Sequence, residues 1–101
     1  MNFLSPSDIL EGNAPENAQY VDVREPAELA AAHWPLFQNL PLSSFDSTFS
    51  KLDKNRPVVV ICAAGMRSLK AATFLQNQGY ASVWNVDGGM NAAAAEGAPL
   101  V

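Results

Sequence analysis

The residue with the clearest chemical potential is Cys62, the only cysteine in the 101-residue chain. It follows a run of four β-branched residues at 58–61, and Arg67 stands five positions after it. The thiolate is the reactive form of a cysteine, and helix N-termini or nearby cations lower the thiol pKa from ~8.5 to roughly 3.5–7.5. The Cys-x4-Arg spacing therefore indicates a loop that holds an anionic sulfur or binds an anion.

The segments around Cys62 predict a strand, a tight loop and a helix. The β-branched run is typical of a strand buried on both faces of a sheet. Residues 68–78 carry apolar side chains at helical spacing, and Gly79 follows where a helix end favours a left-handed residue. The first turn of such a helix offers unpaired N–H groups and the positive end of its dipole to the loop.

Small residues shape the loop itself. Gly65 permits backbone conformations that are closed to other residues. Ala63 and Ala64 have short side chains, so we expect the mouth above the sulfur to be open. Cysteine is also among the most buried residue types, so a packing role for Cys62 is the alternative. The arrangement of strand, Cys-x4-Arg loop with an internal glycine, and helix favours a reactive thiol.

The rest of the chain predicts helices that alternate with strands. The first half is expected to have a helix at 6–10, a strand at 19–23, a helix at 26–32 and a loop with an extended end at 33–41. A helix at 45–52, capped by Ser43 or Ser44, leads to the strand at 58–61 and the helix at 68–78. A strand at 81–86 and a last helix after Gly88-Gly89 complete the order. This order favours a parallel sheet with helices on both faces. Ligands bind beyond the carboxyl ends of such strands, where Cys62 and residues 22–24 lie.

Length and composition limit the class of protein. The chain suits one domain over residues 1–101, and 49% hydrophobic with 16% charged residues argues against disorder. The net charge of −4 argues against a nucleic-acid partner, and no apolar run approaches the ~20 residues of a membrane span. A single cysteine excludes an internal disulfide and a Cys-rich metal site. With no evident signal peptide, we expect a cytoplasmic location, where reducing conditions keep a thiol usable.

Four segments of the chain, taken in order, resemble the rhodanese family of single-domain sulfurtransferases. They are Y-V-D-V-R-E at 20–25, A-H-W-P through N-L-P-L at 32–42, C-A-A-G-M-R-S at 62–68 and N-V-D-G-G-M at 85–90. The resemblance spans nearly the whole chain. It implies a three-layer α/β fold of the rhodanese type, with a central, mostly parallel sheet and helices on both faces.

The resemblance also implies a reaction and its residues. Cys62 is expected to be the nucleophile and to carry sulfur as a persulfide, which it receives from thiosulfate or a small persulfide and passes to cyanide or a thiol. The backbone N–H groups of the loop that follows Cys62 are expected to hold this persulfide. The residues of this loop are Ala63, Ala64, Gly65, Met66, Arg67 and Ser68. The resemblance implies no metal and no organic cofactor.

The chain departs from the family pattern at several positions. Leu36 stands where glycine is frequent in the family, and Ala93 stands where many members carry tryptophan. The loop residues Ala63, Ala64 and Met66 are uncharged, whereas some members place basic residues there. We therefore expect the thiosulfate dianion to be a poorer donor than a persulfide such as that of glutathione.

The charged residues near the loop have these expected roles. Arg67 either faces the pocket or turns back to Asp22 or Glu25 and braces the loop. Asp22 and Arg24 are expected to support the site by tying down loops at a strand end. His33 stands beside Trp34 and Pro35, which favours a loop anchor over a general base.

Two alternatives to a small-molecule sulfurtransferase are considered. A sulfur-carrier or regulatory module of this fold would act with a sulfur-accepting protein, and the presence of Cys62 argues against an inert module. Phosphatases and arsenate reductases of the related fold have a loop that is longer by one residue, Cys-x5-Arg. The Cys-x4-Arg loop is smaller and suits a single sulfur atom.

Overall fold

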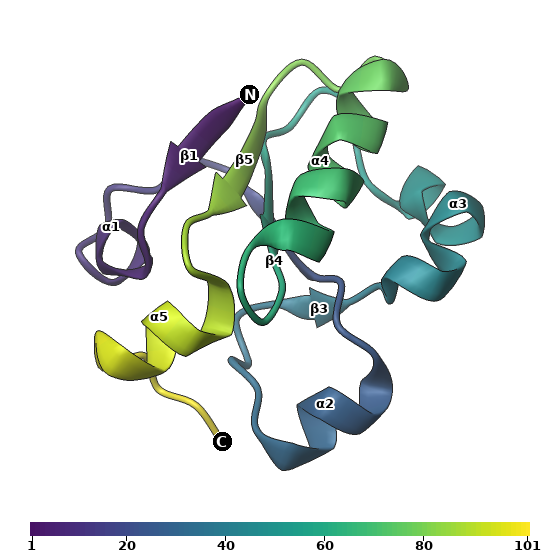
Figure 1. The fold of residues 1–101 in the computed structure, drawn as a ribbon. Helices are drawn as coiled ribbons and strands as arrows, with labels where there is room; N and C mark the ends of the chain where they lie inside the picture. Colours follow the sequence, from purple (N-terminus) through teal and green to yellow (C-terminus); the bar gives the residue numbers. More distant parts are fainter.

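The computed structural model describes residues 1–101 and has a five-stranded parallel sheet at its centre (Figure 1). The strands are β1 (Asn2–Leu4), β2 (Gln19–Asp22), β3 (Gln38–Asn39), β4 (Val58–Ile61) and β5 (Val83–Val86). Their order is β1-β5-β4-β2-β3, and every neighbouring pair is parallel. The strand β4 lies in the middle, and all of its residues are fully buried, as its β-branched sequence predicts.

Helices cover both faces of this sheet (Figure 1). They are α1 (Pro6–Leu10), α2 (Pro26–Ala31), α3 (Phe45–Thr48), α4 (Met66–Asn77) and α5 (Gly89–Ala95), with the short 3₁₀ turns η1 (Leu42–Ser44) and η2 (Phe49–Lys51) around α3. None of them has the length and apolar character that crossing a membrane requires.

Alternation along β4 divides the apolar core in two. Val58 and Val60 belong to one cluster, which also includes residues of α3 and α4. Val59 and Ile61 belong to a second cluster with Trp34 and with residues of α5. Because successive side chains of a strand point to opposite faces, these clusters lie on either side of the sheet. The predicted three-layer α/β arrangement is confirmed.

Several elements differ from the sequence-based expectation. The strand expected at 81–86 is β5, which begins two residues later, at Val83. The strand β1 was not predicted, since only three residues pair at the edge of the sheet. The helix expected at 45–52 is broken into α3 and η2, and η1 precedes it. Neither Ser43 nor Ser44 caps α3 through its side chain, and the Ser43 hydroxyl donates to Glu25 instead. The helix α4 begins two residues early, at Met66, directly after Gly65 with its φ of +102°.

Candidate active site

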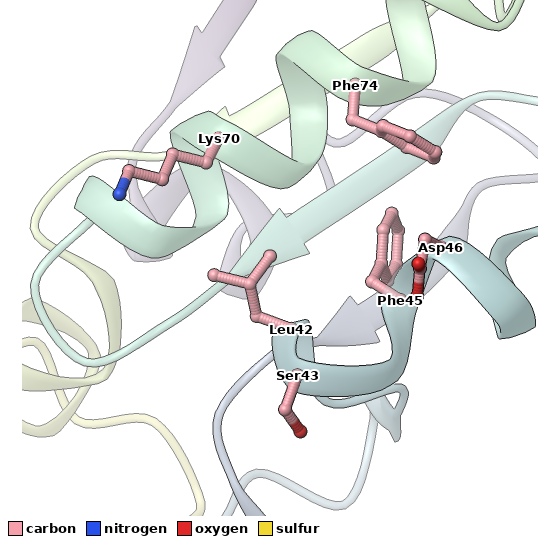
Figure 2. Close-up of a pocket in the computed structure, with 6 residues that line it drawn as sticks. All are labelled: Leu42, Ser43, Phe45, Asp46, Lys70 and Phe74. Atoms are coloured by element: carbon pink, nitrogen blue, oxygen red, sulfur yellow. The ribbon is translucent and has the colours of Figure 1, made fainter.

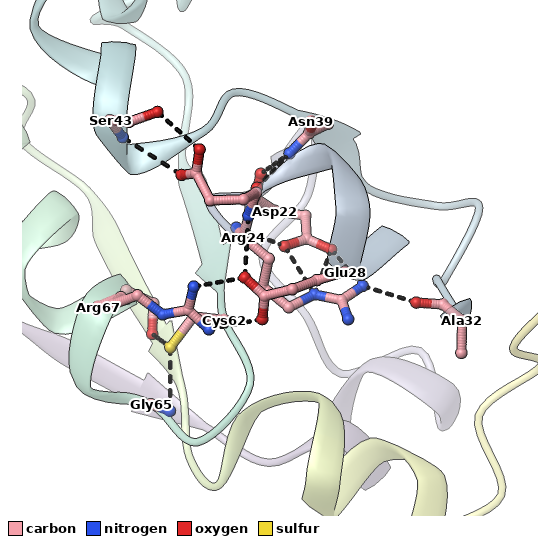
Figure 3. Close-up of polar contacts among 11 residues, drawn as sticks. Asp22, Arg24, Glu28, Ala32, Asn39, Ser43, Cys62, Gly65 and Arg67 are labelled. Carbon is pink, nitrogen blue, oxygen red and sulfur yellow. Dashed lines mark hydrogen bonds and ion pairs between the residues drawn. The ribbon is translucent and has the colours of Figure 1, made fainter. Parts of the chain in front are cut away.

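Cys62 directly follows β4, at the carboxyl edge of the sheet, and begins the loop that we call the active loop, residues 62–68 (Figure 3). The active loop runs from β4 into the first turn of α4. Only 1% of Cys62 is exposed, so the expectation of an open mouth is wrong. The short side chains of Ala63 and Ala64 therefore do not leave Cys62 exposed.

Two groups of the active loop lie at hydrogen-bond distance from the sulfur. The backbone N–H of Gly65 donates to Sγ over 3.1 Å, and the hydroxyl of Ser68 lies 3.2 Å from Sγ. The φ of +102° at Gly65 is a left-handed conformation that favours glycine, so this residue type allows the turn. Ser68 is fully buried in the first turn of α4. The sulfur is therefore held by a strand end, a glycine turn and a helix start.

These contacts lower the pKa of the Cys62 thiol below its ordinary value. Burial alone acts in the opposite direction and raises the pKa. Hydrogen bonds outweigh it, the strongest from the Ser68 hydroxyl and the others from the backbone N–H groups of Ser68, Gly65 and Ala64. Since all of these groups favour an anionic sulfur, the site is suited to a thiolate.

The helix α5 fixes the direction of the peptide groups in the active loop. The N–H of Met90 donates to the carbonyl of Cys62 over 2.8 Å, and the N–H of Asn91 donates to the carbonyl of Ala63 over 3.0 Å. The C=O and N–H of a trans peptide point in opposite directions. Because α5 holds these carbonyls, the N–H groups of Ala63 and Ala64 point away from α5.

Gly89 makes this approach of α5 possible. A Cβ at this position would lie 2.3 Å from the carbonyl oxygen of Cys62 and 2.6 Å from that of Ala63. Its φ of +57° also falls in the left-handed region. Gly89 is therefore required by close contact with the active loop.

Arg67 braces the active loop through a residue that the sequence analysis did not single out. Its Nη1 and Nη2 donate to Oε1 and Oε2 of Glu28 on α2, over 2.6 and 2.8 Å (Figure 3). The bracing role was one of the two expectations, but the expected partners Asp22 and Glu25 were wrong. The hydrogen bonds from Arg67 lower the pKa of Glu28 to about 2, and Glu28 in turn raises the pKa of Arg67.

Asp22 and Arg24 form a buried pair beside the active loop. The guanidinium donates to the Asp22 carboxylate, with Nη2 2.9 Å from Oδ2, and to the carbonyl of Ala32 over 2.9 Å (Figure 3). The side-chain amide of Asn39 donates to the carbonyls of Asp22 and Arg24 over 2.9 and 2.8 Å. Neither Asp22 nor Arg24 bonds to the active loop through its side chain, so the pair positions the segment at 32–39.

His33 lies in this same segment. Its Nδ1 is 3.2 Å from the carbonyl of Leu29, and its backbone N–H and C=O bond to Val101. These contacts agree with the predicted role as a loop anchor. No group of three or more His, Cys, Asp or Glu side chains is arranged to hold a metal ion.

Two surface grooves run along α4. One, of about 340 Å³, lies between α4 and the segment of η1 and α3, and Figure 2 shows its lining by Leu42, Ser43, Phe45, Asp46, Lys70 and Phe74. The other, of about 440 Å³, is lined by Met66, Leu69, Lys70 and Thr73. Cys62 lines neither groove, but the second begins at Met66 of the active loop, which is 70% exposed.

Known proteins are similar to this chain in sequence and in fold. Residues 5–96 match the rhodanese-like domain family. A sulfurtransferase of Allochromatium vinosum is 40% identical over 86 residues, which are 85% of this chain and 80% of the relative. The thiosulfate sulfurtransferase GlpE of Pseudomonas putida is 35% identical over 86 residues, 85% of this chain and 78% of the relative.

Solved structures agree with the sequence comparison. A rhodanese-related protein of Thermoplasma volcanium matches with a TM-score of 0.87 and 32% identity, over 100% of this chain and 98% of that one. This likeness confirms the fold that the four sequence segments predicted.

Proposed function

Since the chain belongs to the rhodanese family, we propose that it is a sulfurtransferase in which Cys62 carries the transferred sulfur as a persulfide. The observation that carries the proposal is the set of hydrogen-bond donors around the single thiol. Gly65 and Ser68 contact the sulfur directly, and their bonds favour its anionic form. A persulfide, R–S–S⁻, needs the same kind of surroundings as the thiolate that forms it.

The proposed reaction has two steps. The Cys62 thiolate attacks the outer sulfur of a donor such as thiosulfate, the S–S bond of the donor breaks, and sulfite leaves with the electron pair. In the second step an acceptor attacks the outer sulfur of the Cys62 persulfide and restores the thiolate. Cyanide gives thiocyanate in this step, and a thiolate gives a new persulfide. Each step is a nucleophilic displacement, so no metal or organic cofactor is required.

We further propose that thiosulfate is a poor donor for this chain. The active loop presents uncharged side chains at Ala63, Ala64 and Met66, its cation Arg67 is engaged by Glu28, and the whole chain carries −4. The negative electrostatic field of the protein lowers the rate at which a dianion encounters the site. A persulfide with a less concentrated charge depends less on side-chain cations, because the backbone N–H groups bind its terminal sulfur.

An added cation tests this donor preference. Ala64 is exposed, so Ala64→Lys places a charge at the loop without disturbing the core. We expect kcat/KM for thiosulfate to rise by about tenfold, more than for glutathione persulfide, and the gain to shrink as salt screens the charge. A wild-type protein that already prefers thiosulfate, or an equal gain for both donors, would show that charge does not decide donor choice.

A sulfur carrier that serves a protein acceptor is the second candidate. The exposed side chain of Met66 and the groove that begins there offer an apolar contact surface beside the active loop. Turnover with small donors and acceptors separates the two functions, since a carrier would take up one sulfur and release it slowly to small thiols.

We also propose a cytoplasmic location, because reducing conditions keep a single thiol available.

Intact-mass measurement tests the persulfide directly. Incubation with a sulfur donor should add one sulfur mass to the protein, and cyanide or a thiol should remove it. Cys62 is the only cysteine, so the adduct has one available site. Cys62→Ser should abolish both the adduct and the formation of thiocyanate. Undiminished sulfur transfer by this variant would refute the assignment of Cys62.

A further inference from the structure

We propose that Glu28 is a specificity-determining residue of the active site, which neutralises Arg67 and so selects against dianionic sulfur donors. The inference rests on the proposed sulfurtransferase function and adds a residue from a different element. Glu28 lies on α2, 39 positions before Arg67 in the chain. It has no contact with the Cys62 sulfur, and it acts through the charge of the active loop.

The contact between Glu28 and Arg67 is a bidentate salt bridge. Both terminal nitrogens of the guanidinium face the carboxylate, with distances of 2.6 and 2.8 Å. This geometry is the strongest form of an arginine–carboxylate contact. Oε1 of Glu28 also accepts the backbone N–H of Glu25 over 3.1 Å, at the start of α2. The carboxylate is therefore held by the backbone of α2 as well as by the cation.

The pair cancels the charge that the active loop would otherwise present. A cation and an anion in direct contact have little net field beyond a few ångströms, and salt screens the remainder. The second arginine of the site, Arg24, is likewise paired with Asp22. The Glu25 carboxylate is bound by Ser43. Lys70 is exposed one turn further along α4 and lines the two surface grooves, outside the active loop.

The neutral pair leaves the binding of the substrate sulfur to backbone N–H groups. These groups bind one anionic atom well, and they offer nothing to the second charge of a dianion such as thiosulfate. With the Glu28 charge removed, Arg67 would attract that second charge. With Arg67 removed, the Glu28 carboxylate would repel it. The two substitutions should therefore change the rate with a dianionic donor in opposite directions.

A matched pair of donors isolates this effect. Thiosulfate is a dianion, and the methanethiosulfonate anion delivers the same outer sulfur from a sulfonyl group with one charge fewer. In Glu28→Gln we expect kcat/KM for thiosulfate to rise by about three- to tenfold at low salt. We expect kcat/KM for methanethiosulfonate to rise by only about twofold. In Arg67→Gln we expect kcat/KM for thiosulfate to fall by a similar factor, and the double variant should restore the wild-type ratio of the two donors.

The control variant is Glu16→Gln, which makes the same change in net charge at an exposed carboxylate that precedes β2, at the opposite edge of the sheet from the active loop. We expect it to change the donor ratio by less than about twofold. Thermal unfolding establishes that each variant is folded, and if Arg67→Gln does not fold, the donor ratio of Glu28→Gln and its salt dependence decide the question.

The outcomes distinguish this inference from the function on which it rests. If Glu28→Gln and Arg67→Gln lower the rates with both donors equally, the pair only supports the active loop and the inference is wrong. The sulfurtransferase function would stand in that case. If the wild-type protein forms no persulfide and no thiocyanate with either donor, the proposed function itself is wrong.

Discussion

The hydroxyl of Ser68 offers a direct test of how the site holds an anionic sulfur. It lies 3.2 Å from Sγ of Cys62 and is the strongest of the groups that lower the pKa of this thiol. Ser68→Ala removes the hydroxyl and keeps a good helix former in the first turn of α4. The backbone N–H of Gly65, 3.1 Å from the sulfur, stays in place. The variant thus removes one donor from a site that keeps the others.

The expected size of the effect follows from the charge on the acceptor. A hydrogen bond to a charged group contributes about 1.5–3 kcal/mol, and we take the lower end because sulfur is a weak acceptor. A loss of about 1.4 kcal/mol corresponds to a tenfold change in an equilibrium. We therefore expect the pKa of Cys62 to rise in Ser68→Ala, and the thiolate population to fall about tenfold at pH values below it.

Alkylation of Cys62 by iodoacetamide, measured as a function of pH, reports this change. The wild-type and variant rates should differ about tenfold at the acidic end and converge at the alkaline end, where both thiols are ionised. A thiolate of higher pKa is intrinsically more nucleophilic, so the alkaline rate of the variant should not be lower. Thr73→Ala, which removes a hydroxyl that donates to Leu69 on the exposed side of α4, serves as the control.

Two results would contradict this reasoning. An unchanged pH profile in Ser68→Ala would mean that the hydroxyl does not stabilise the thiolate. An equal loss of rate at every pH would mean that the substitution damages the active loop and leaves the ionisation of Cys62 unaltered. The shape of the profile separates these cases, and a single rate at neutral pH would not.

Two further predictions concern the reaction class and the backbone of the site. The Cys-x4-Arg loop is expected to hydrolyse an aryl phosphate only at a negligible rate, and robust hydrolysis that Cys62→Ser abolishes would favour the phosphatase alternative. Gly89→Ala should lower the free energy of unfolding in a denaturant titration by roughly 3 kcal/mol, because its Cβ would lie 2.3 Å from the Cys62 carbonyl oxygen. Gly97→Ala, at φ +88° with nothing within 4 Å, should cost only about 1 kcal/mol, and equal losses would contradict the close-contact argument.

The sequence predicts the fold well because its strongest signals are local and consistent. Four β-branched residues form the most buried strand, and the alternation of strands with helices leads to a parallel sheet. Gly79 has the expected left-handed conformation, with φ +92°. Ser5 caps α1 through a bond from the Asp8 N–H to its side chain, and serine is a residue type that favours this position. Each of these features depends on residues that are neighbours in the chain.

The features that the sequence did not predict depend on contacts between distant segments. The strand β1 has only three residues, and its pairing with β5, more than 80 positions away, defines it. The partner of Arg67 is one of three carboxylates near the end of β2, and only the placement of α2 selects Glu28 over Asp22 and Glu25. The covered sulfur likewise depends on the path of the loop backbone, which the small side chains of Ala63 and Ala64 do not determine.

The direction in which the peptide groups of the active loop point depends on residues that lie outside the loop. Three of its carbonyls are held from β5 and α5: Met90 and Asn91 bind those of Cys62 and Ala63, and the side-chain amide of Asn85 donates to that of Gly65 over 3.2 Å. The alanines and the glycine at 63–65 have no side chains that would fix their peptide planes, and a peptide that turned over would direct an oxygen toward the thiolate.

Electrostatic stabilisation depends on donors that are already oriented before the charge appears. The segment from Asn85 through Asn91 supplies this orientation, so it supports the candidate active site although it makes no hydrogen bond to the sulfur. Substitutions at Ala63 or Ala64 should therefore change the surface of the active loop and leave its donors intact. Substitutions at Asn85 or Gly89 should release the carbonyls and weaken the preference of the site for an anionic sulfur.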